Sequence, residues 1–162
     1  MLPFNVREQF VLREIDIAMN AALDQPTQNS FRAAAMLNPS CIACGEANPH
    51  GLRLHFSRQG CAVYANWVPT DNWQGFRGVI HGGVVTTVLD EAMSKAVVAC
   101  GWEALTAELT VRLRARVVPG ESLTVMGMVR SKRKREIRTE ACVIDDSGRE
   151  RAHAWGKFLV VR

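Results

Sequence analysis

The chain has 162 residues, of which 48% are hydrophobic and 22% are charged. This composition predicts one compact domain with its own hydrophobic core and room for a short appendage. No apolar run is long enough to cross a membrane, and charged residues interrupt the N-terminal stretch where a signal peptide would be apolar. We therefore expect a cytoplasmic protein that does not bind a membrane.

The formal net charge of +4 is concentrated in two places. One is the basic stretch 130–138, and the other is the alternating set Arg112, Arg114 and Arg116. Such clusters attract a phosphate-bearing small molecule, a nucleic acid or an anionic membrane, although a solvated strand face or turn has the same composition. No segment has the pattern of a DNA recognition helix, so we expect no nucleic-acid partner.

Five cysteines, an odd number, do not indicate a disulfide framework in a chain of this size. Cys41 and Cys44 form a C-x-x-C pair, but a structural zinc site usually takes its four ligands from two such pairs. The remaining cysteines, Cys61, Cys100 and Cys142, are isolated in the sequence. We expect Cys41 and Cys44 to be reduced and packed in a loop, with no metal.

The N-terminal segment has its own pattern. Residues 4–23 place Val11, Ile15 and Met19 at the spacing of one helix face, and a polar linker follows at 24–30. The chain from 38 to 51 is rich in Gly, Pro and Asn, which is typical of a loop. We therefore divide the chain into a helical extension, residues 1–37, and a main domain, residues 38–162.

The main domain combines strands with one apolar helix. The helix is expected over 83–100 and ends at Gly101, after which the period of the apolar residues changes from 3.6 to 2. The helix is followed by what we read as a meander of long antiparallel strands, which predicts an α+β fold. The expected strands are 52–57, 61–68, 108–118, 123–130, 136–145 and 151–161.

Two carboxylates lie in the middle of this apolar helix. Glu91 stands four residues before Lys95, which is a favourable intrahelical ion pair. Asp90 has no cation within helical reach, and an unpaired carboxylate at the border of an apolar face is costly. Asp90 is therefore the first candidate for a functional residue.

The helix begins with His81, Gly82 and Gly83. The first N–H groups of a helix have no intrahelical partner and lie at its positive end, so they can bind an anion or an oxygen that gains charge in a reaction. His81 is either a residue that caps this terminus or a direct participant in catalysis. Asp90 lies eight residues after Gly82, about 12 Å along one helix, so the two can act on one substrate only across two antiparallel copies of the helix.

The motif "HGGVVTTVLD" resembles that of hotdog-fold acyl-CoA thioesterases, particularly the phenylacetyl-CoA-thioesterase-like branch. The upstream "CIACGEANPHGLRL" and the strand "TAELTVRLRARVVPGE" resemble segments of the same family, and the likeness covers about residues 40–160. The resemblance implies a five- or six-stranded antiparallel sheet wrapped around the helix, with active sites at the interface of a homodimer. It makes residues 38–162 a hotdog thioesterase domain, and we expect a dimer of dimers, a homotetramer.

The resemblance also implies roles for single residues. Asp90 is the acidic catalyst, either a general base or a nucleophile, and the N–H groups of Gly82 and Gly83 polarise the thioester carbonyl. His81 supports the turn, and Thr106 lies where relatives often carry a residue that helps to hold the attacking water.

Two further expectations concern the substrate. Many relatives carry Asn or Gln where this chain has Gly75, and Gln74 is expected to substitute for it after a shift of one residue. Coenzyme A carries phosphates, so the basic stretch is the candidate binding site. Its residues are Arg130, Lys132, Arg133, Lys134 and Arg135.

Hydrolysis of an acyl-CoA to free acid and coenzyme A needs a carboxylate, a water and an oxyanion donor, and no cofactor or metal. Two alternatives remain open at this point. An acyl-thioester dehydratase or hydratase on the same fold would use His81 together with Asp90. A non-catalytic acyl-CoA sensor would bind the ligand without turnover.

Overall fold

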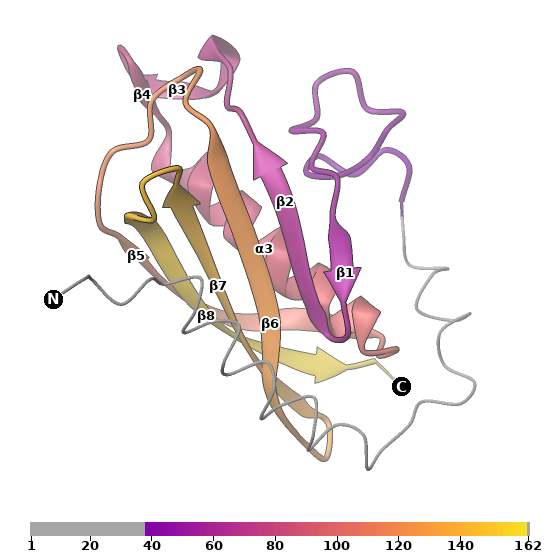
Figure 1. Cartoon of the computed structure of the whole chain (residues 1–162). Helices are drawn as coiled ribbons and strands as arrows, with labels where there is room; N and C mark the ends of the chain where they lie inside the picture. Colours follow the sequence, from indigo (N-terminus) through magenta and orange to yellow (C-terminus); the bar gives the residue numbers. More distant parts are fainter. Residues whose placement is uncertain (1–37, 162) are drawn as a thin grey trace, which may run out of the picture.

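The computed structural model describes residues 38–161. Its single long helix, α3 (Gly82–Ala99), packs against a six-stranded antiparallel sheet with strand order β1-β2-β6-β7-β8-β5, as Figure 1 shows. This arrangement confirms the predicted α+β fold in which one helix is wrapped by an antiparallel sheet. The helical extension predicted over 1–37 lies outside the described residues. In the described part of the chain, no helix has the length and apolar character to cross a membrane.

The observed strands follow the predicted ones with shifted ends. The region 52–56, which we expected to open a strand, is loop, and β5 begins at Ala104 and ends at Leu113 rather than spanning 108–118. A short 3₁₀ turn and a two-stranded ribbon, β3 paired with β4, form where a loop was predicted. The bounds are β1 Ser57–Gln59, β2 Ala62–Trp67, η1 Asp71–Trp73, β3 Gln74–Phe76, β4 Val79–Ile80, β5 Ala104–Leu113, β6 Leu123–Arg133, β7 Glu136–Asp145 and β8 Glu150–Val160.

The strands after the helix do not form the simple meander that we predicted. Strands β6, β7 and β8 pair in sequence order, but β5 pairs with β8 and forms the far edge of the sheet. The chain from 114 to 122 makes this crossing possible, because it runs past the helix entrance, where the Ile80 N–H donates to the Val117 carbonyl at 2.8 Å. Within this sheet, consecutive strands therefore pair with each other only where a tight turn joins them.

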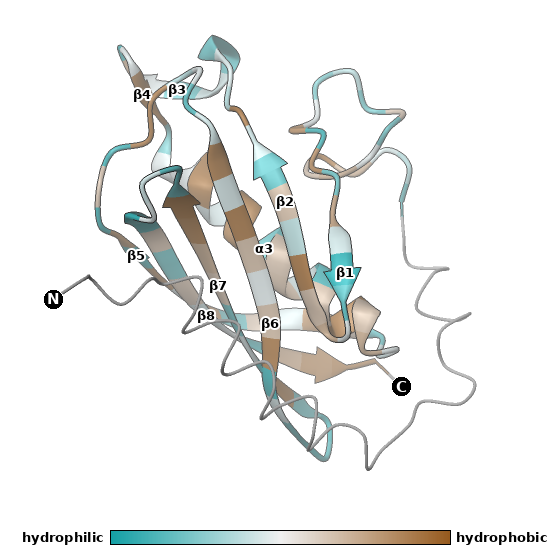
Figure 2. Ribbon diagram, viewed as in Figure 1, coloured by the Kyte–Doolittle hydropathy of each residue, from teal (hydrophilic) through white to brown (hydrophobic). Residues whose placement is uncertain are grey.

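The core lies between α3 and the inner face of the sheet. Figure 2 shows apolar residues along α3 and along the central strands. The helix and β6 approach closely at Gly127, where a Cβ atom would fall 2.4 Å from the Ala92 carbonyl oxygen. The apolar spacing of the helix predicts a buried face that includes Ala99, but Val97 is buried in its place and Ala99 is half-buried. The buried members are Val85, Val88, Leu89, Ala92, Met93, Ala96 and Val97.

The opposite face of the sheet carries a buried charge network centred on His153. Its Nε2 lies 2.7 Å from Glu140 and its Nδ1 lies 2.8 Å from Glu150. Arg130 Nε pairs with Glu140 at 3.0 Å, and Arg114 pairs with Glu150. Burial alone would lower the pKa of His153, but its hydrogen bonds to both glutamates raise it. The network therefore favours a charged imidazole.

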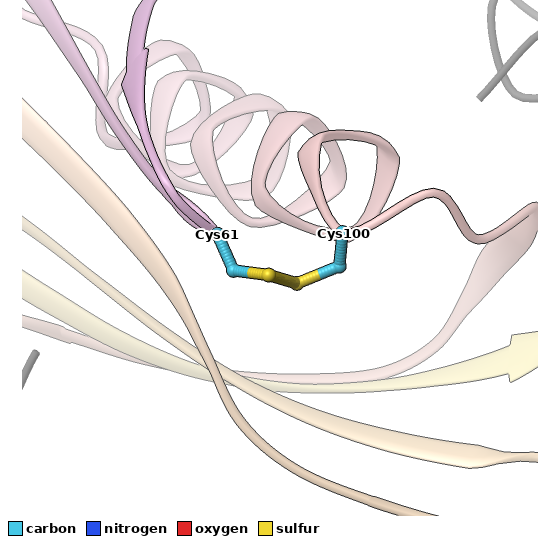
Figure 3. Close-up of a disulfide and its surroundings, with 2 residues drawn as sticks. All are labelled: Cys61 and Cys100. Atoms are coloured by element: carbon cyan, nitrogen blue, oxygen red, sulfur yellow. A yellow bond between two sulfur atoms is a disulfide. The ribbon is translucent and has the colours of Figure 1, made fainter. Parts of the chain in front are cut away.

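A disulfide corrects the prediction for the isolated cysteines. Cys61 and Cys100 are bonded, with their Cα atoms 4.9 Å apart (Figure 3). Cys61 lies in the turn between β1 and β2, and Cys100 caps the C-terminal end of α3. These residues are 39 positions apart, so local sequence patterns carry no signal for the pairing. The disulfide fixes the end of the helix to the edge of the sheet.

Candidate active site at the helix entrance and the sheet edge

The entrance of α3 is built around the His81 side chain. His81 is the N-cap of the helix, and its Nδ1 accepts a hydrogen bond of 2.9 Å from the Gly83 N–H. An imidazole nitrogen that accepts a hydrogen bond carries no proton, so the ring proton is on Nε2 when the ring is neutral. The structure thus assigns His81 the capping role, one of the two that the sequence left open. The Gly83 N–H, expected as a second oxyanion donor, is already bonded to His81.

Gly82 offers the free donor at this entrance. Within the described part of the chain, its N–H has no hydrogen-bond partner, and as the first helical residue it lies at the positive end of α3. A cavity of about 500 Å³ opens here, and a Cβ atom on Gly82 would lie 2.8 Å from Leu113 Cδ1. Residues lining the cavity include Phe76, Ile80, His81, Gly82, Leu113 and Arg116.

Gln74 braces the loop beside this entrance, and Gly75 lines the cavity next to His81. The Gln74 amide donates to Asp71 Oδ1 at 2.8 Å and to the Asp71 carbonyl at 3.2 Å, and its oxygen accepts from the Gly78 N–H. The side chain expected to replace the family's amide is therefore bonded within its own loop. At Gly75, a Cβ atom would fall 2.8 Å from His81 Cδ2, so a side chain at this position would displace the imidazole.

Asp90 and Thr106 form the second half of the candidate site. The Thr106 hydroxyl, on β5, donates a hydrogen bond of 2.8 Å to Asp90 Oδ1. Burial raises the pKa of Asp90, the hydrogen bond from Thr106 counteracts this, and the nearby charge of Glu91 adds to the rise. The helical ion pair predicted for Glu91 is present, because Lys95 Nζ lies 3.5 Å from Glu91 Oε1. Asp90 is thus a half-buried carboxylate with a hydroxyl partner and no cationic partner among the described residues.

The two halves are separate within one chain. Asp90 lies about 12 Å from Gly82 along the helix and does not line the entrance cavity. Thr106 and Leu113 lie beside these two halves on β5, seven positions apart, which corresponds to about 23 Å of strand. Within residues 38–161, strand β5 has one hydrogen-bonded neighbour, β8, and no described strand pairs with its other edge. Leu105 and Leu113 are 56% and 54% exposed along this strand.

The basic stretch forms the hairpin between β6 and β7, and most of its side chains have partners. Arg130 pairs with Glu140, Lys132 lies over the Trp102 ring at 5.5 Å, and Arg135 donates to the Val160 carbonyl at 3.0 Å. Among residues 38–161, Arg133 and Lys134 have no such partner, and both are exposed.

Sequence reasoning missed two features of this region. The first is that Phe76 and Leu113 line the entrance cavity, although the alternation of apolar residues along 109–113 was a usable signal for Leu113. The second is that the C-x-x-C loop lies against the central helix, with Cys41 Sγ 3.9 Å from Glu91 Oε2. Nothing in the local sequence indicates this contact.

Comparisons with known proteins point to one protein superfamily. Residues 77–152 match the family model of the thioesterase superfamily. None of the curated protein sequences compared with the chain matches it significantly. A thioesterase superfamily protein of known structure is 22% identical, with a TM-score of 0.74 over 98% of this chain and 81% of its own.

Two further structures are similar. The E. coli PaaI protein from the phenylacetic acid degradation operon is 17% identical, with a TM-score of 0.70 over 84% of this chain and 96% of its own. A Streptococcus mutans UA159 protein bound to acetyl CoA is 18% identical, with a TM-score of 0.64 over 67% of this chain and 88% of its own. These matches confirm the resemblance stated from the sequence: the chain has the hotdog fold, and residues 77–152 match the thioesterase superfamily model.

Proposed function

We propose that the protein hydrolyses acyl-CoA thioesters at a site shared by two copies of the chain. The observation that carries the proposal is the separation of two complementary half-sites. One half is the Asp90 carboxylate bonded to Thr106, and the other is the free Gly82 N–H in the entrance cavity. A carboxylate and an oxyanion donor are the groups that thioester hydrolysis requires, and neither half holds both.

The open edge of β5 supplies a way to join the halves. Antiparallel pairing of β5 with the same strand of a second copy, centred between Leu109 and Thr110, sets Thr106 opposite the partner's Leu113. Thr106 holds Asp90, and Leu113 contacts Gly82, so this register brings each carboxylate to the other chain's helix entrance. The two-fold symmetry generates two equivalent sites.

The chemistry follows from this arrangement. Asp90 accepts a proton from a water, whose oxygen attacks the thioester carbonyl carbon, and the carbonyl oxygen becomes an oxyanion held by the partner's Gly82 N–H. Collapse of this intermediate breaks the carbon–sulfur bond, and the departing coenzyme A thiolate takes the proton from Asp90. Thr106 occupies one carboxylate oxygen and leaves the other for the water. An oxyanion donor contributes about 3 kcal/mol, and general-base assistance contributes roughly 10²- to 10⁴-fold.

The substrate class rests on the hairpin charges and on relatives. The Streptococcus mutans protein of the same fold was solved with acetyl CoA. The hairpin that carries Arg133 and Lys134 lies at the end of the molecule where α3 ends and β5 begins (Figure 1), on the side of Thr106. Two free cations there are suited to the phosphates of coenzyme A.

Release of free thiol from a panel of short, aryl and long acyl-CoAs tests the activity. We expect turnover by the native chain and a loss of roughly 10²- to 10⁴-fold in kcat for Asp90→Asn, because the amide cannot accept the proton. Glu103→Gln, which changes a carboxylate outside the site, serves as the control and should retain activity. Hydration of an enoyl-CoA without thiol release would instead support the dehydratase or hydratase class, and binding without turnover would support a sensor.

A further inference from the structure

The C-x-x-C loop closes tightly around Cys41. The Ala43 N–H donates to Cys41 Sγ at 3.4 Å, and the Gly45 N–H donates to the Cys41 carbonyl at 3.0 Å. A Cβ atom on Gly45 would lie 2.4 Å from both the Cys41 nitrogen and the Pro39 carbonyl oxygen. Glycine at this position therefore permits the turn, because a side chain would collide with the backbone of Cys41 and Pro39. The backbone of the loop thus fixes the position of the Cys41 sulfur.

The loop brings its two thiols to the polar side of α3. One ligand atom from each of Cys41, Cys44 and Glu91 lies within 4.8 Å of the others, and all three residues are half-buried. Cys41 Sγ and Glu91 Oε2 are 3.9 Å apart. A tetrahedral zinc ion, with bonds of about 2.3 Å to sulfur and 2.0 Å to oxygen, separates its ligand atoms by roughly 3.5–3.8 Å. The three groups are therefore close to the spacing that one ion requires.

The charges around this cluster also balance. Lys95 lies 3.5 Å from Glu91 and neutralises its carboxylate. If both thiols lose their protons to solvent, two thiolates and a carboxylate carry three negative charges, which a divalent ion and the Lys95 ammonium together cancel.

We propose that Cys41, Cys44 and Glu91 form a structural zinc site that fixes the loop 38–56 to α3. The ligand set favours zinc, because two thiolates select a thiophilic ion and exclude magnesium or calcium. The fourth position of the tetrahedron is left to water. This site replaces our expectation of a metal-free, packed loop, and it is independent of the thioester chemistry proposed above. A C-x-x-C pair alone did not predict it, because the third ligand comes from a helix 47 residues further along the chain.

Metal titration of the full chain, prepared without oxygen and stripped with a chelator, tests the site. We expect one Zn²⁺ ion per chain and, with Co²⁺ in its place, a thiolate-to-cobalt charge-transfer band. Cys41→Ser and Cys44→Ser should each lose this band, whereas Cys142→Ser, which removes a free cysteine elsewhere, should keep it. Glu91→Gln should keep the band, because both thiolates remain. It should weaken zinc binding by at least about tenfold, because mutating even a group that only hydrogen-bonds to a metal ligand typically costs roughly 10- to 100-fold in affinity.

Stability provides a readout that needs no variant. Chelation should lower the melting temperature of the native chain and added Zn²⁺ should restore it, because an ion that binds only the folded state stabilises that state. Zinc binding that survives the double substitution Cys41→Ser/Cys44→Ser would overturn the proposal. The absence of a charge-transfer band in the native chain would do so as well, as would a Cys41–Cys44 disulfide in the oxygen-free preparation. None of these outcomes depends on thioesterase activity.

Discussion

The Thr106 hydroxyl donates a hydrogen bond of 2.8 Å to Asp90 Oδ1, and this bond joins the edge strand β5 to the central helix. It is the one side-chain partner that the described structure gives to Asp90, a carboxylate whose pKa is raised by burial. The Thr106 hydroxyl therefore holds the Asp90 carboxylate in position without neutralising its charge.

Replacing Thr106 with valine removes the hydroxyl and keeps the shape. We expect kcat for thiol release to fall roughly tenfold, since a hydrogen bond to a charged group contributes about 1.5 kcal/mol or more. KM should change little, because the hydroxyl contacts Asp90 and not the substrate. Thr106→Ser keeps the donor and should retain most of the activity. Equal losses in the valine and serine variants would show that the hydroxyl does not act through Asp90.

Mixed dimers test the shared site directly. Asp90→Ala removes the carboxylate, and Gly82→Pro removes the donor N–H at a helix position where proline is tolerated. Each variant alone should be almost inactive. After denaturation and refolding as an equal mixture, about half of the dimers are mixed, and each carries one intact site and one doubly defective site. Activity should then recover to roughly a quarter of that of the native protein.

The result of mixing is informative only if subunits exchange, so native mass spectrometry should first establish that mixed dimers are present. Mixed dimers with no recovered activity would mean that Asp90 and Gly82 do not meet across the interface. The shared-site geometry would then be wrong, even if the protein were a thioesterase.

The hairpin cations are expected to affect substrate binding rather than chemistry. Neutralising the free pair with Arg133→Gln and Lys134→Gln should raise KM for an acyl-CoA severalfold and leave kcat nearly unchanged. The effect should be larger at low ionic strength, because salt screens exposed charges. Arg58→Gln, on the short strand β1, removes one positive charge outside the hairpin and provides the control for each single hairpin substitution. An unchanged KM in the double variant at low salt would assign the hairpin charges to solvation alone.

The His153 network predicts how stability depends on pH. The pKa of His153 is raised above its ordinary value of 6.5, because hydrogen bonds to Glu140 and Glu150 outweigh the opposing effect of burial. A raised pKa means that the stabilisation is fully present below the unfolded value and is lost as the pH rises through the folded value. Cys142, which faces the same glutamates, stays protonated here because burial raises its pKa well above the ordinary value.

Urea unfolding of the native chain and of His153→Gln checks this prediction. The stability difference in favour of the native chain should be greatest below pH 6.5 and should shrink as the pH rises. Arg114 and Arg130 pair with the same glutamates and are present in both proteins, so the comparison isolates His153. A difference that is constant with pH would show that His153 contributes by packing alone.

The sequence predicted those parts of the fold that depend on local periodicity. The apolar arc of α3, the pairing of Glu91 with Lys95 and the strands after the helix follow from spacings of two, three or four residues. Asp90 stood out because an unpaired carboxylate at an apolar border is unusual, and in the structure it accepts a hydrogen bond from Thr106.

The features that the sequence did not predict join residues far apart in the chain. The pairing of β5 with β8 and the contact of Cys41 with Glu91 are decided by packing, which leaves no local pattern. Gln74, which we expected to contact the substrate, instead bonds within its own loop for a different reason. An amide can bond to its own loop as readily as to a substrate, and Asp71 and Gly78 provide partners close by.

The Cys61–Cys100 disulfide makes the segment between these residues a covalent ring. The ring contains residues of both half-sites, namely Gly82 at the helix entrance and the Asp90 carboxylate. It also contains the exposed loop at Arg77. A protease that cuts once after Arg77 would leave two fragments still bonded to each other. The nicked molecule would migrate as one chain in a gel without reductant and as two chains with it, so the helix could not be carried away from the sheet by a single cleavage.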